Sequence, residues 1–356
     1  MIEKIKKFWQ IIAAILLFLG AFGGMSAART VQGFADWYGT RIYPVLAGIL
    51  GRISGLFSFS IVETGIYGLT VLIIFYGIRH IKKPWLLIKN GIFLVSCICF
   101  LYVTACGINY SRTPFSEVIG LDTRDSSEEE LYQLCEFLTE QVIQVSKEET
   151  GQASQNQALT FKEAWKMGRE GVKAMEKLGK TYPQLAGFYP NPKPVCISWI
   201  LSVQQLSGVY SPFTIEANFN RAMTPYNIPH TVCHELSHLK GFMREDEANF
   251  IGYLACIGSD LPEYQYSGYL TGWIYATNAL YKENPEQYFE LYGRLPETAV
   301  NNLAANTLFW DKYEGKVAET ATKLNDTYLK LNEQEEGVKS YGRVVDLMLA
   351  YYRLSL

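Results

Sequence analysis

The sequence contains few histidines, an odd number of cysteines and little excess charge of either sign. Its 356 residues include four histidines and seven cysteines, and the net charge is -3. Such a balance gives no basis for a nucleic-acid partner, which a clustered excess of lysine and arginine would indicate. The cysteines form no C-x-x-C pair, and no repeat or low-complexity run occurs. We therefore expect buried, reduced thiols, with a bridge such as Cys196–Cys256 left open.

The scarcity of histidine makes its placement informative, because two of the four stand in one short motif. The stretch from His234 to His238 reads H-E-L-S-H, an H-E-x-x-H pentad. Residues four apart lie on the same face of a helix, so both imidazoles can reach one metal ion. Glu235 would then lie beside the metal, where it can deprotonate a bound water. The flanks fit a helix, since Pro229 suits its first position and Gly241 the residue just past its end.

A zinc site of this kind needs a third protein ligand and one position open to water. With so few histidines we expect a carboxylate, and Glu245 opens the stretch E-D-E-A-N directly after the turn. In a second helix, Ala248 and Asn249 would share its face, so that Ala248 lets the helices approach and Asn249 hydrogen-bonds a ligand. Glu247 points elsewhere by helical phase, which favours Glu245 while Glu247 stays the alternative. His230, four residues before the pentad, is expected to line the cleft or cap the helix.

These motifs resemble a known group of proteins. H-E-L-S-H followed by E-D-E-A-N resembles the gluzincin branch of zinc metallopeptidases, in which an E-x-x-A-D or E-x-x-A-N helix supplies the glutamate ligand. More closely, the chain resembles a bacterial membrane-anchored, zincin-like family catalogued as domain of unknown function 3810. The resemblance implies a zinc-hydrolase fold in which His234, His238 and Glu245 hold Zn²⁺ and Glu235 is the base. The matching segments are residues 210–214, 216–218, 233–238, 245–256, 266–269 and 340–343.

Long hydrophobic runs are confined to the first third of the chain. Residues 8–25, 61–78 and 91–108 are each long enough to cross the hydrocarbon core of a membrane. Lysines precede the first run and a basic cluster, Arg79 to Lys83, follows the second, so the positive-inside rule places both in the cytoplasm. Residues 1–108 are thus the expected membrane region, with a cytoplasmic N-terminus, and 109–356 an extracytoplasmic domain. The stretch 29–60 is expected to lie in the interface or beneath that domain.

From residue 109 onward the pattern predicts a mostly helical domain with a small sheet, which makes the fold α+β. Capping boxes at Ser127 with Glu130 and at Thr160 with Glu163 predict helices to about residues 147 and 178. β-Branched and aromatic residues predict strands at 195–202 and 208–220. The part 213–220 is either an edge strand that accepts an extended peptide or an ordinary core strand. Further helices are expected at 267–282, 285–292, 296–331 and 337–354.

These features predict a multi-pass zinc metallopeptidase that hydrolyses peptide bonds at the outer face of a bacterial cell membrane. Its expected partners are the lipid bilayer and a peptide or protein substrate near it. The alternative is a non-catalytic envelope or sensor protein with a structural zinc site, against which Glu235 argues because a structural site does not need it. Hydrolysis also profits from a donor to the developing oxyanion. Four residues of the family-like segments are candidates for that donor: Tyr266, Tyr269, Tyr341 and Arg343.

Overall fold

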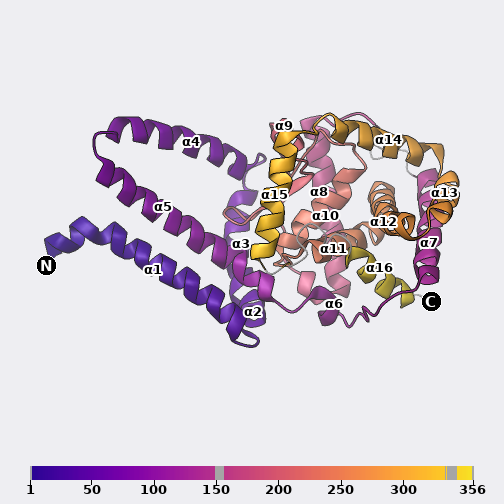
Figure 1. Ribbon diagram of the computed structural model, residues 1–356, viewed down its shortest axis with the longest axis horizontal. Coiled ribbons are helices and arrows are strands. Elements are labelled where there is room, and N and C mark those ends of the chain that lie inside the picture. The colour runs from indigo at the N-terminus through magenta and orange to yellow at the C-terminus, as the bar shows by residue number, and fades with distance from the viewer. Residues whose placement is uncertain (1, 149–155, 333, 335–342, 355–356) are drawn as a thin grey trace. The chain divides into compact units, whose positions relative to one another are not determined.

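The computed structural model describes residues 2–148, 156–332, 334 and 343–354 (Figure 1). The chain divides into two compact units, of which unit 1 contains residues 1–113 with 211–216, and unit 2 contains residues 114–210 with 217–356. Unit 1 is built from long apolar helices, whereas unit 2 consists of helices that accompany a three-stranded sheet. The predicted α+β fold, mostly helical with a small sheet, is confirmed.

Unit 1 contains three helices that are long and apolar enough to cross a membrane, at Phe8–Thr30, Ile61–His80 and Pro84–Ser111. The first belongs to α1 (Ile2–Thr30), and the second is α4 (Ile61–His80). The third combines α5 (Pro84–Ala105) with a 3-10 turn at Gly107–Ser111. Each predicted span lies inside one of these helices. The direction in which they cross a membrane stays a prediction.

Small residues allow α1 to pack closely against α5. Ala14, Ala21 and Ala28 recur at intervals of seven residues on α1, and all three are buried. In lipid the hydrophobic effect does not drive helices together, so close backbone approach at small residues supplies the attraction. Near the N-terminal end of this contact, the rings of Trp9 and Phe93 meet edge-on at 5.5 Å.

Residues 29–60 fold into helices rather than an open loop. They form α2 (Phe34–Trp37), a π-helical turn at Tyr38–Ile42 and α3 (Tyr43–Gly55). The inserted segment 211–216 ends at Glu216, whose buried carboxylate accepts the backbone N–H groups of Ile61 at 3.0 Å and Val62 at 2.9 Å. The first N–H groups of a helix have no partner within it, so Glu216 caps the start of α4.

Unit 2 opens with α6 (Phe115–Val118), followed by α7 (Glu128–Glu148) and α8 (Phe161–Thr181). Both predicted capping boxes are present. Ser127 and Glu130 exchange hydrogen bonds at the start of α7, and Thr160 and Glu163 do so at the start of α8. α7 ends one residue beyond its predicted end, and α8 ends three residues beyond. The local sequence therefore predicted both helices closely.

Beyond the site the described chain is helical, with α12 (Pro262–Glu283), α13 (Pro285–Gly293), α14 (Glu297–Asp311), α15 (Lys316–Leu331) and α16 (Arg343–Arg353). The single helix predicted over 296–331 is wrong, because a turn at 312–315 separates α14 from α15. Gly315 adopts φ 137° in that turn, a conformation open mainly to glycine. The predicted helix at 337–354 is described only from Arg343 onward, and the earlier part lies outside the described residues.

The sheet has the strand order β1–β3–β2, with β1 (Lys193–Pro194), β2 (Gly208–Ser211) and β3 (Glu216–Phe219). β1 pairs with β3 in parallel, so that Lys193 lies opposite Asn218. The strand predicted at 195–202 is wrong, since Ser198–Ser202 forms the short helix α9, and an apolar run of this length fits either structure. The single strand predicted at 208–220 is two strands, β2 and β3. Of the two alternatives for 213–220, the structure shows the core strand, because β3 is central and β2 lies at an edge.

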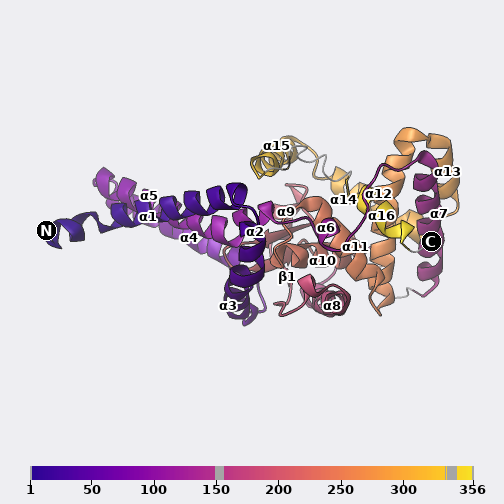
Figure 2. The same cartoon turned by 90° about the horizontal axis from the view of Figure 1, so that it is seen from below.

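The pentad lies in α10 (Asn227–Leu239), which packs against α8, α11 and α12 (Figure 2). The helix begins two residues before Pro229, so this proline stands in the first turn rather than at the first position. Its end agrees with the prediction, since the N–H of Gly241 bonds to the carbonyl of His238 and Gly241 adopts φ 88°. The expected second helix is α11 (Glu245–Ile257).

Candidate metal centre

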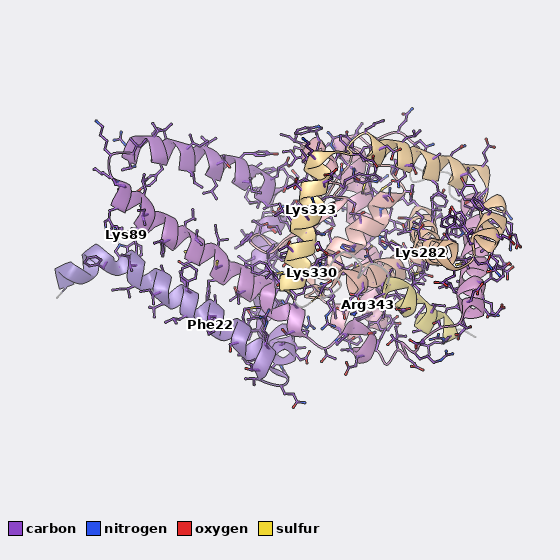
Figure 3. All side chains as sticks on the ribbon, viewed as in Figure 1. Phe22, Lys89, Lys282, Lys323, Lys330 and Arg343 are labelled. Carbon is purple, nitrogen blue, oxygen red and sulfur yellow. The ribbon has the colours of Figure 1, made fainter. Side chains whose placement is uncertain are left out.

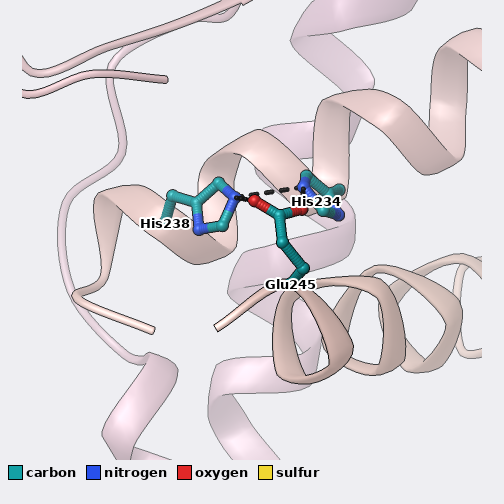
Figure 4. A group of neighbouring side chains, drawn as sticks. All are labelled: His234, His238 and Glu245. Atoms are coloured by element: carbon teal, nitrogen blue, oxygen red, sulfur yellow. Dashed lines mark hydrogen bonds and ion pairs between the residues drawn. The ribbon is translucent and has the colours of Figure 1, made fainter. Parts of the chain in front are cut away.

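Two helices and one tight turn bring the three predicted ligands together. α10 carries His234 and His238, the chain reverses over residues 240–244, and Glu245 is the first residue of α11. The ligating atoms of these three residues all lie within 4.8 Å of one another. Figure 4 shows the carboxylate of Glu245 reaching from α11 toward both imidazoles of α10. The structure thus assembles the three residues that the sequence singled out.

The distances between these atoms fit a single metal ion. The Nε2 atoms of His234 and His238 are 3.0 Å apart. The Glu245 carboxylate oxygens lie 3.3 Å from Nε2 of His234 and 3.7 Å from Nε2 of His238. Ligands that bind zinc tetrahedrally at its usual bond lengths are about 3.3 Å from one another. Two imidazoles and a carboxylate are also a donor set of catalytic zinc sites, which keep a fourth position for water.

Hydrogen bonds orient both imidazoles toward the common point. Nδ1 of His234 donates to Oδ1 of Asn249 at 2.8 Å, and Nδ1 of His238 donates to the carbonyl of Phe242 at 2.8 Å. Because each Nδ1 carries the proton, each Nε2 presents its lone pair to an ion. The predicted hydrogen bond between Asn249 and a histidine of the pentad is present, and Ala248 is fully buried where α11 packs against α10.

Tyr275 of α12 is a residue of this site that sequence reasoning missed. Its hydroxyl donates to the same oxygen of Asn249 at 3.1 Å, so Asn249 receives bonds from both His234 and Tyr275. Burial and the charge of Glu245 raise the pKa of Tyr275, which keeps the hydroxyl protonated as a donor. No motif distinguishes this residue among 24 tyrosines. Only the packing of α12 against α10 and α11 brings it here.

His230 lies on the same face of α10 as His234 and His238, but its imidazole is hydrogen-bonded to the backbone of α11. Its Nε2 bonds to the backbone carbonyl of Asn249 at 3.1 Å, and its backbone N–H donates to Ser267 Oγ. Burial, and then the charge of His234, lower the pKa of His230 to about 3. A neutral imidazole on a backbone carbonyl connects α10 to α11. This role differs from the expected lining of the cleft.

Glu247, the alternative third ligand, is turned away from the imidazoles. Its carboxylate accepts the backbone N–H of Phe115 at 2.6 Å and lies 3.8 Å from the guanidinium of Arg244. The side chain is buried, so this contact supplies an acceptor to an otherwise buried N–H. The structure therefore places Glu245, and not Glu247, beside the two histidines.

Glu235 is buried at the point where α10 meets strand β2. Its carboxylate accepts the backbone N–H of Tyr210, and it packs against Gly208. A Cβ at position 208 would lie 2.8 Å from Cγ of Glu235 and 2.8 Å from Cγ2 of Thr231, so only glycine leaves room for this carboxylate. Burial, opposed by the charge of His234 and helped by that of Glu245, raises the pKa of Glu235 to about 8. A carboxylate with a pKa near neutrality suits a proton-transfer role.

When no metal is bound, the three predicted ligands share one proton. Burial lowers the pKa of His234, but the hydrogen bond and charge of Glu245 outweigh burial and raise this pKa to about 9. Burial and the charge of His234 lower the pKa of His238 to about 4. Burial raises the pKa of Glu245, yet the two imidazoles lower it overall. At pH 7 one imidazolium thus faces a carboxylate, and a cation must displace its proton.

Two of the predicted oxyanion donors are engaged in packing. The hydroxyl of buried Tyr266 donates to Oδ1 of Asn302, and Tyr269 lies close to Tyr351. Tyr341 lies outside the described residues. These positions give no support to a role of Tyr266 or Tyr269 at the metal centre.

The fourth predicted donor, Arg343, is exposed at the start of α16, where its charge acts on Asp246 (Figure 3). The ring of Tyr210 does lie near the candidate site, with its centroid 6.2 Å from that of His238. Tyr210 is part of β2, the strand that also contacts Glu235. The pairing of that strand with the sheet, rather than a local motif, sets its position.

The cysteines are free thiols. Cys233 and Cys256 are buried side by side between α10 and α11, where the thiol of Cys233 is hydrogen-bonded to that of Cys256. Cys196 is exposed, and the bridge to Cys256 that the sequence left open is not formed. The expectation of buried thiols holds for four of the seven cysteines and not for Cys196, which is exposed, or for Cys97 and Cys99, which are half-buried.

Comparison with known proteins gives a family but no described relative. No curated protein and no solved structure matches the chain. One family model, described as a protein of unknown function (DUF3810), matches residues 38–349. The matched stretch covers most of the chain and contains the pentad, Glu245 and Tyr275. The chain therefore belongs to the DUF3810 family.

Proposed function

We propose that this protein is a membrane-anchored, zinc-dependent peptidase. The observation that supports it best is the arrangement of the three predicted ligands, whose donor atoms are 3.0 to 3.7 Å apart with Glu235 buried next to them. A chance cluster of two histidines and a glutamate would not require oriented Nδ1 atoms. Here both Nδ1 atoms are held by hydrogen bonds, as in metal sites in general.

Each residue has a defined task in this proposal. His234, His238 and Glu245 would hold the ion, which when bound supplies a water of lowered pKa and polarises the substrate carbonyl. Glu235 accepts a proton from the attacking water and passes it to the leaving nitrogen. The N–H of Tyr210 keeps the Glu235 carboxylate in place, and burial sets its pKa near neutrality.

A peptide is the substrate class that the surroundings of Glu235 favour. Strand β2 lies at an edge of the sheet and donates a backbone N–H to Glu235. Extended peptides bind to such edges by adding a strand through main-chain hydrogen bonds. The edge strand thus remains part of the proposal, although β2 takes the place predicted for residues 213–220. Bound there, a peptide backbone would pass beside the base.

The three apolar helices suggest that the enzyme acts at a membrane. The positive-inside rule puts the site on the outer face, so we propose a cell-envelope or membrane-proximal polypeptide as the substrate. A non-catalytic zinc protein is the second candidate. A structural zinc site has four protein ligands, whereas within the described part of the chain three residues are grouped beside a buried glutamate. This difference favours the enzyme.

The test is to measure zinc in the purified full-length protein in detergent, beside the variants Glu245→Ala, Glu235→Gln and Glu247→Gln. We expect about one zinc per chain in the parent, in Glu235→Gln and in the control Glu247→Gln, with loss in Glu245→Ala. Cleavage of a peptide library should occur with the parent and stop in Glu235→Gln. Zinc without any cleavage would support the structural alternative, and a folded parent without zinc would refute both.

A further inference from the structure

Residues 211–216 belong to unit 1, although they lie between two strands that belong mostly to unit 2. The chain therefore leaves unit 2 directly after Tyr210 and returns to it at Ala217. Tyr210 is the residue of β2 whose backbone N–H is donated to the carboxylate of Glu235. The segment 211–216 thus begins next to the strand residue that contacts the proposed base.

Glu216, the last residue of this segment, is fixed to the start of α4. Its side chain is buried, and its two carboxylate oxygens accept the backbone N–H groups of Ile61 at 3.0 Å and Val62 at 2.9 Å. The first N–H groups of a helix have no acceptor within that helix, so a movement of Glu216 away from α4 would leave both of them unpaired. The start of α4 and residue 216 are therefore expected to move together.

The backbone directly before Glu216 is held in a strained conformation. Ile215 has φ 51°, a left-handed conformation that a β-branched residue rarely adopts, and its side chain is fully buried. The hydroxyl of Thr214 donates to Oγ of Ser211 at 2.9 Å and closes the turn. Strain of this kind persists only where the surrounding packing fixes the conformation. The turn is therefore suited to transmit a displacement of Glu216 rather than to absorb it.

Strand β3 begins at Glu216 and lies between β1 and β2 in the sheet. The three strands have two to four residues each, fewer than the usual five or so, so the sheet by itself is only marginally stable. Beside the backbone pairing, the side-chain amide of Asn218 reaches the carbonyl of Val209 at a distance of 3.4 Å. An anchor at the start of β3 therefore helps to keep β2 in place beside Glu235.

The first connection between the two units is anchored in the same way. Asp36 of unit 1 accepts the backbone N–H of Thr113 at 2.9 Å and the hydroxyl of Thr113 at 2.7 Å. Two residues further on, in unit 2, Phe115 donates its backbone N–H to Glu247 of α11 at 2.6 Å. Glu247 follows Glu245 by two residues on the same helix. A carboxylate in unit 1 thus fixes the chain shortly before it contacts an element of the candidate site, as Glu216 does beside β2.

We propose that Glu216 is a positioning residue, which holds strand β2 in place and, through the N–H of Tyr210, the carboxylate of Glu235. The fixed point is the start of α4, a helix long and apolar enough to span a membrane. This role of Glu216 rests on the proposed function, because Glu235 is the base only there. The order of β2, in contrast, can be measured without a substrate.

The experiment is hydrogen–deuterium exchange of the full-length protein in lipid nanodiscs, for the parent and for Glu216→Ala. Overlapping peptides resolve the amides of Ile61 and Tyr210. Exchange at Ile61 should become faster because its acceptor is lost. Exchange at Tyr210 should become faster by about tenfold or more, which is the effect of losing a hydrogen bond to a carboxylate. Amides of α7 should exchange as in the parent, and an unchanged rate at Tyr210 would overturn the proposal.

Ser60→Ala is the matched control for the start of α4. Ser60 is also buried, and its Oγ accepts the N–H of Glu63 in the first turn of the same helix at 3.1 Å. This variant should speed exchange at Glu63 and leave Tyr210 as in the parent. Glu216→Gln keeps one acceptor oxygen and the size of the side chain, so its rate at Tyr210 should lie between those of the parent and Glu216→Ala. It also decides the question if Glu216→Ala does not fold, because a parental rate at Tyr210, or equal loosening in Ser60→Ala, would refute the hold on β2.

Peptide cleavage measures the consequence for the base. In Glu216→Ala, kcat should fall about 100-fold, as expected for a displacement of roughly 1 Å, while the zinc content stays that of the parent. Partial unfolding would instead lower kcat and zinc content together, and that result would contradict a positioning role. Full kcat in a variant with a mobile Tyr210 would contradict it as well. If the parent itself cleaves no peptide, the proposed function fails, and exchange at Tyr210 still decides whether Glu216 holds β2.

Discussion

The hydrogen bond between His234 and Asn249 offers the sharpest test of the metal centre that needs no substrate. Replacing Asn249 with Ala removes the acceptor that lies 2.8 Å from Nδ1 of His234. The ligand would remain, but its orientation and tautomer would no longer be fixed. We therefore expect Asn249→Ala to keep a folded zinc site of lower affinity.

The losses of zinc affinity and of folding stability follow from the two hydrogen bonds that Asn249 accepts. Loss of an outer-shell partner typically weakens metal binding about 10- to 100-fold, which corresponds to about 1.4 to 2.7 kcal/mol. The same substitution removes the acceptor of the buried Tyr275 hydroxyl, which lies 3.1 Å from Asn249 Oδ1. A buried hydroxyl without a partner costs about 1 to 3 kcal/mol of folding stability. Both losses are expected together.

The assay is competition for zinc between the purified full-length protein and a chelating indicator dye, with thermal melting measured in parallel. Asn302→Ala is a matched control, because Asn302 is also buried and also accepts a tyrosine hydroxyl, from Tyr266. The control should lose stability but keep the zinc affinity of the parent. If Asn249→Ala binds zinc as tightly as the parent, or if the control weakens binding equally, the orienting role is refuted.

Three further outcomes follow from the same geometry. Gly208→Ala should retain zinc but lower kcat about 100-fold, because the added Cβ displaces Glu235 by roughly 1 Å. An unchanged kcat for peptide cleavage would contradict the close contact between Gly208 and Glu235. Glu247→Ala should retain zinc but lose about 1 to 3 kcal/mol of folding stability, because the N–H of Phe115 loses its acceptor. The loss is measured as a lower Tm, and a Tm equal to that of the parent would exclude this role of Glu247. In the metal-free protein, His234 should stay protonated at pH 7 and lose its proton only near pH 9, because burial is outweighed by the hydrogen bond and charge of Glu245, which raise its pKa to about 9; NMR of labelled histidine side chains follows this titration, and an imidazole that is neutral at pH 7 would be inconsistent with the raised pKa.

Part of this protein follows from local sequence alone. The spacing of His234 and His238 places both on one helix face because the period of an α-helix is a property of the backbone. The same phase argument directed Glu245 toward them and Glu247 away, and the structure places both side chains accordingly. Apolar runs of about 20 residues identify the candidate spans, since bilayer thickness is a fixed length.

Tertiary structure decided the features that depend on contacts between distant segments. Residues 195–202 have strand-like composition, yet α9 forms there because so short an apolar run carries no decisive periodicity. The position of β2 at an edge of the sheet, beside Glu235, depends on strand pairing that no local motif encodes. Tyr275 reaches Asn249 only because α12 packs on α10 and α11. Local periodicity thus selected the three proposed ligands, and non-local packing brought Tyr275 and β2 to their neighbourhood.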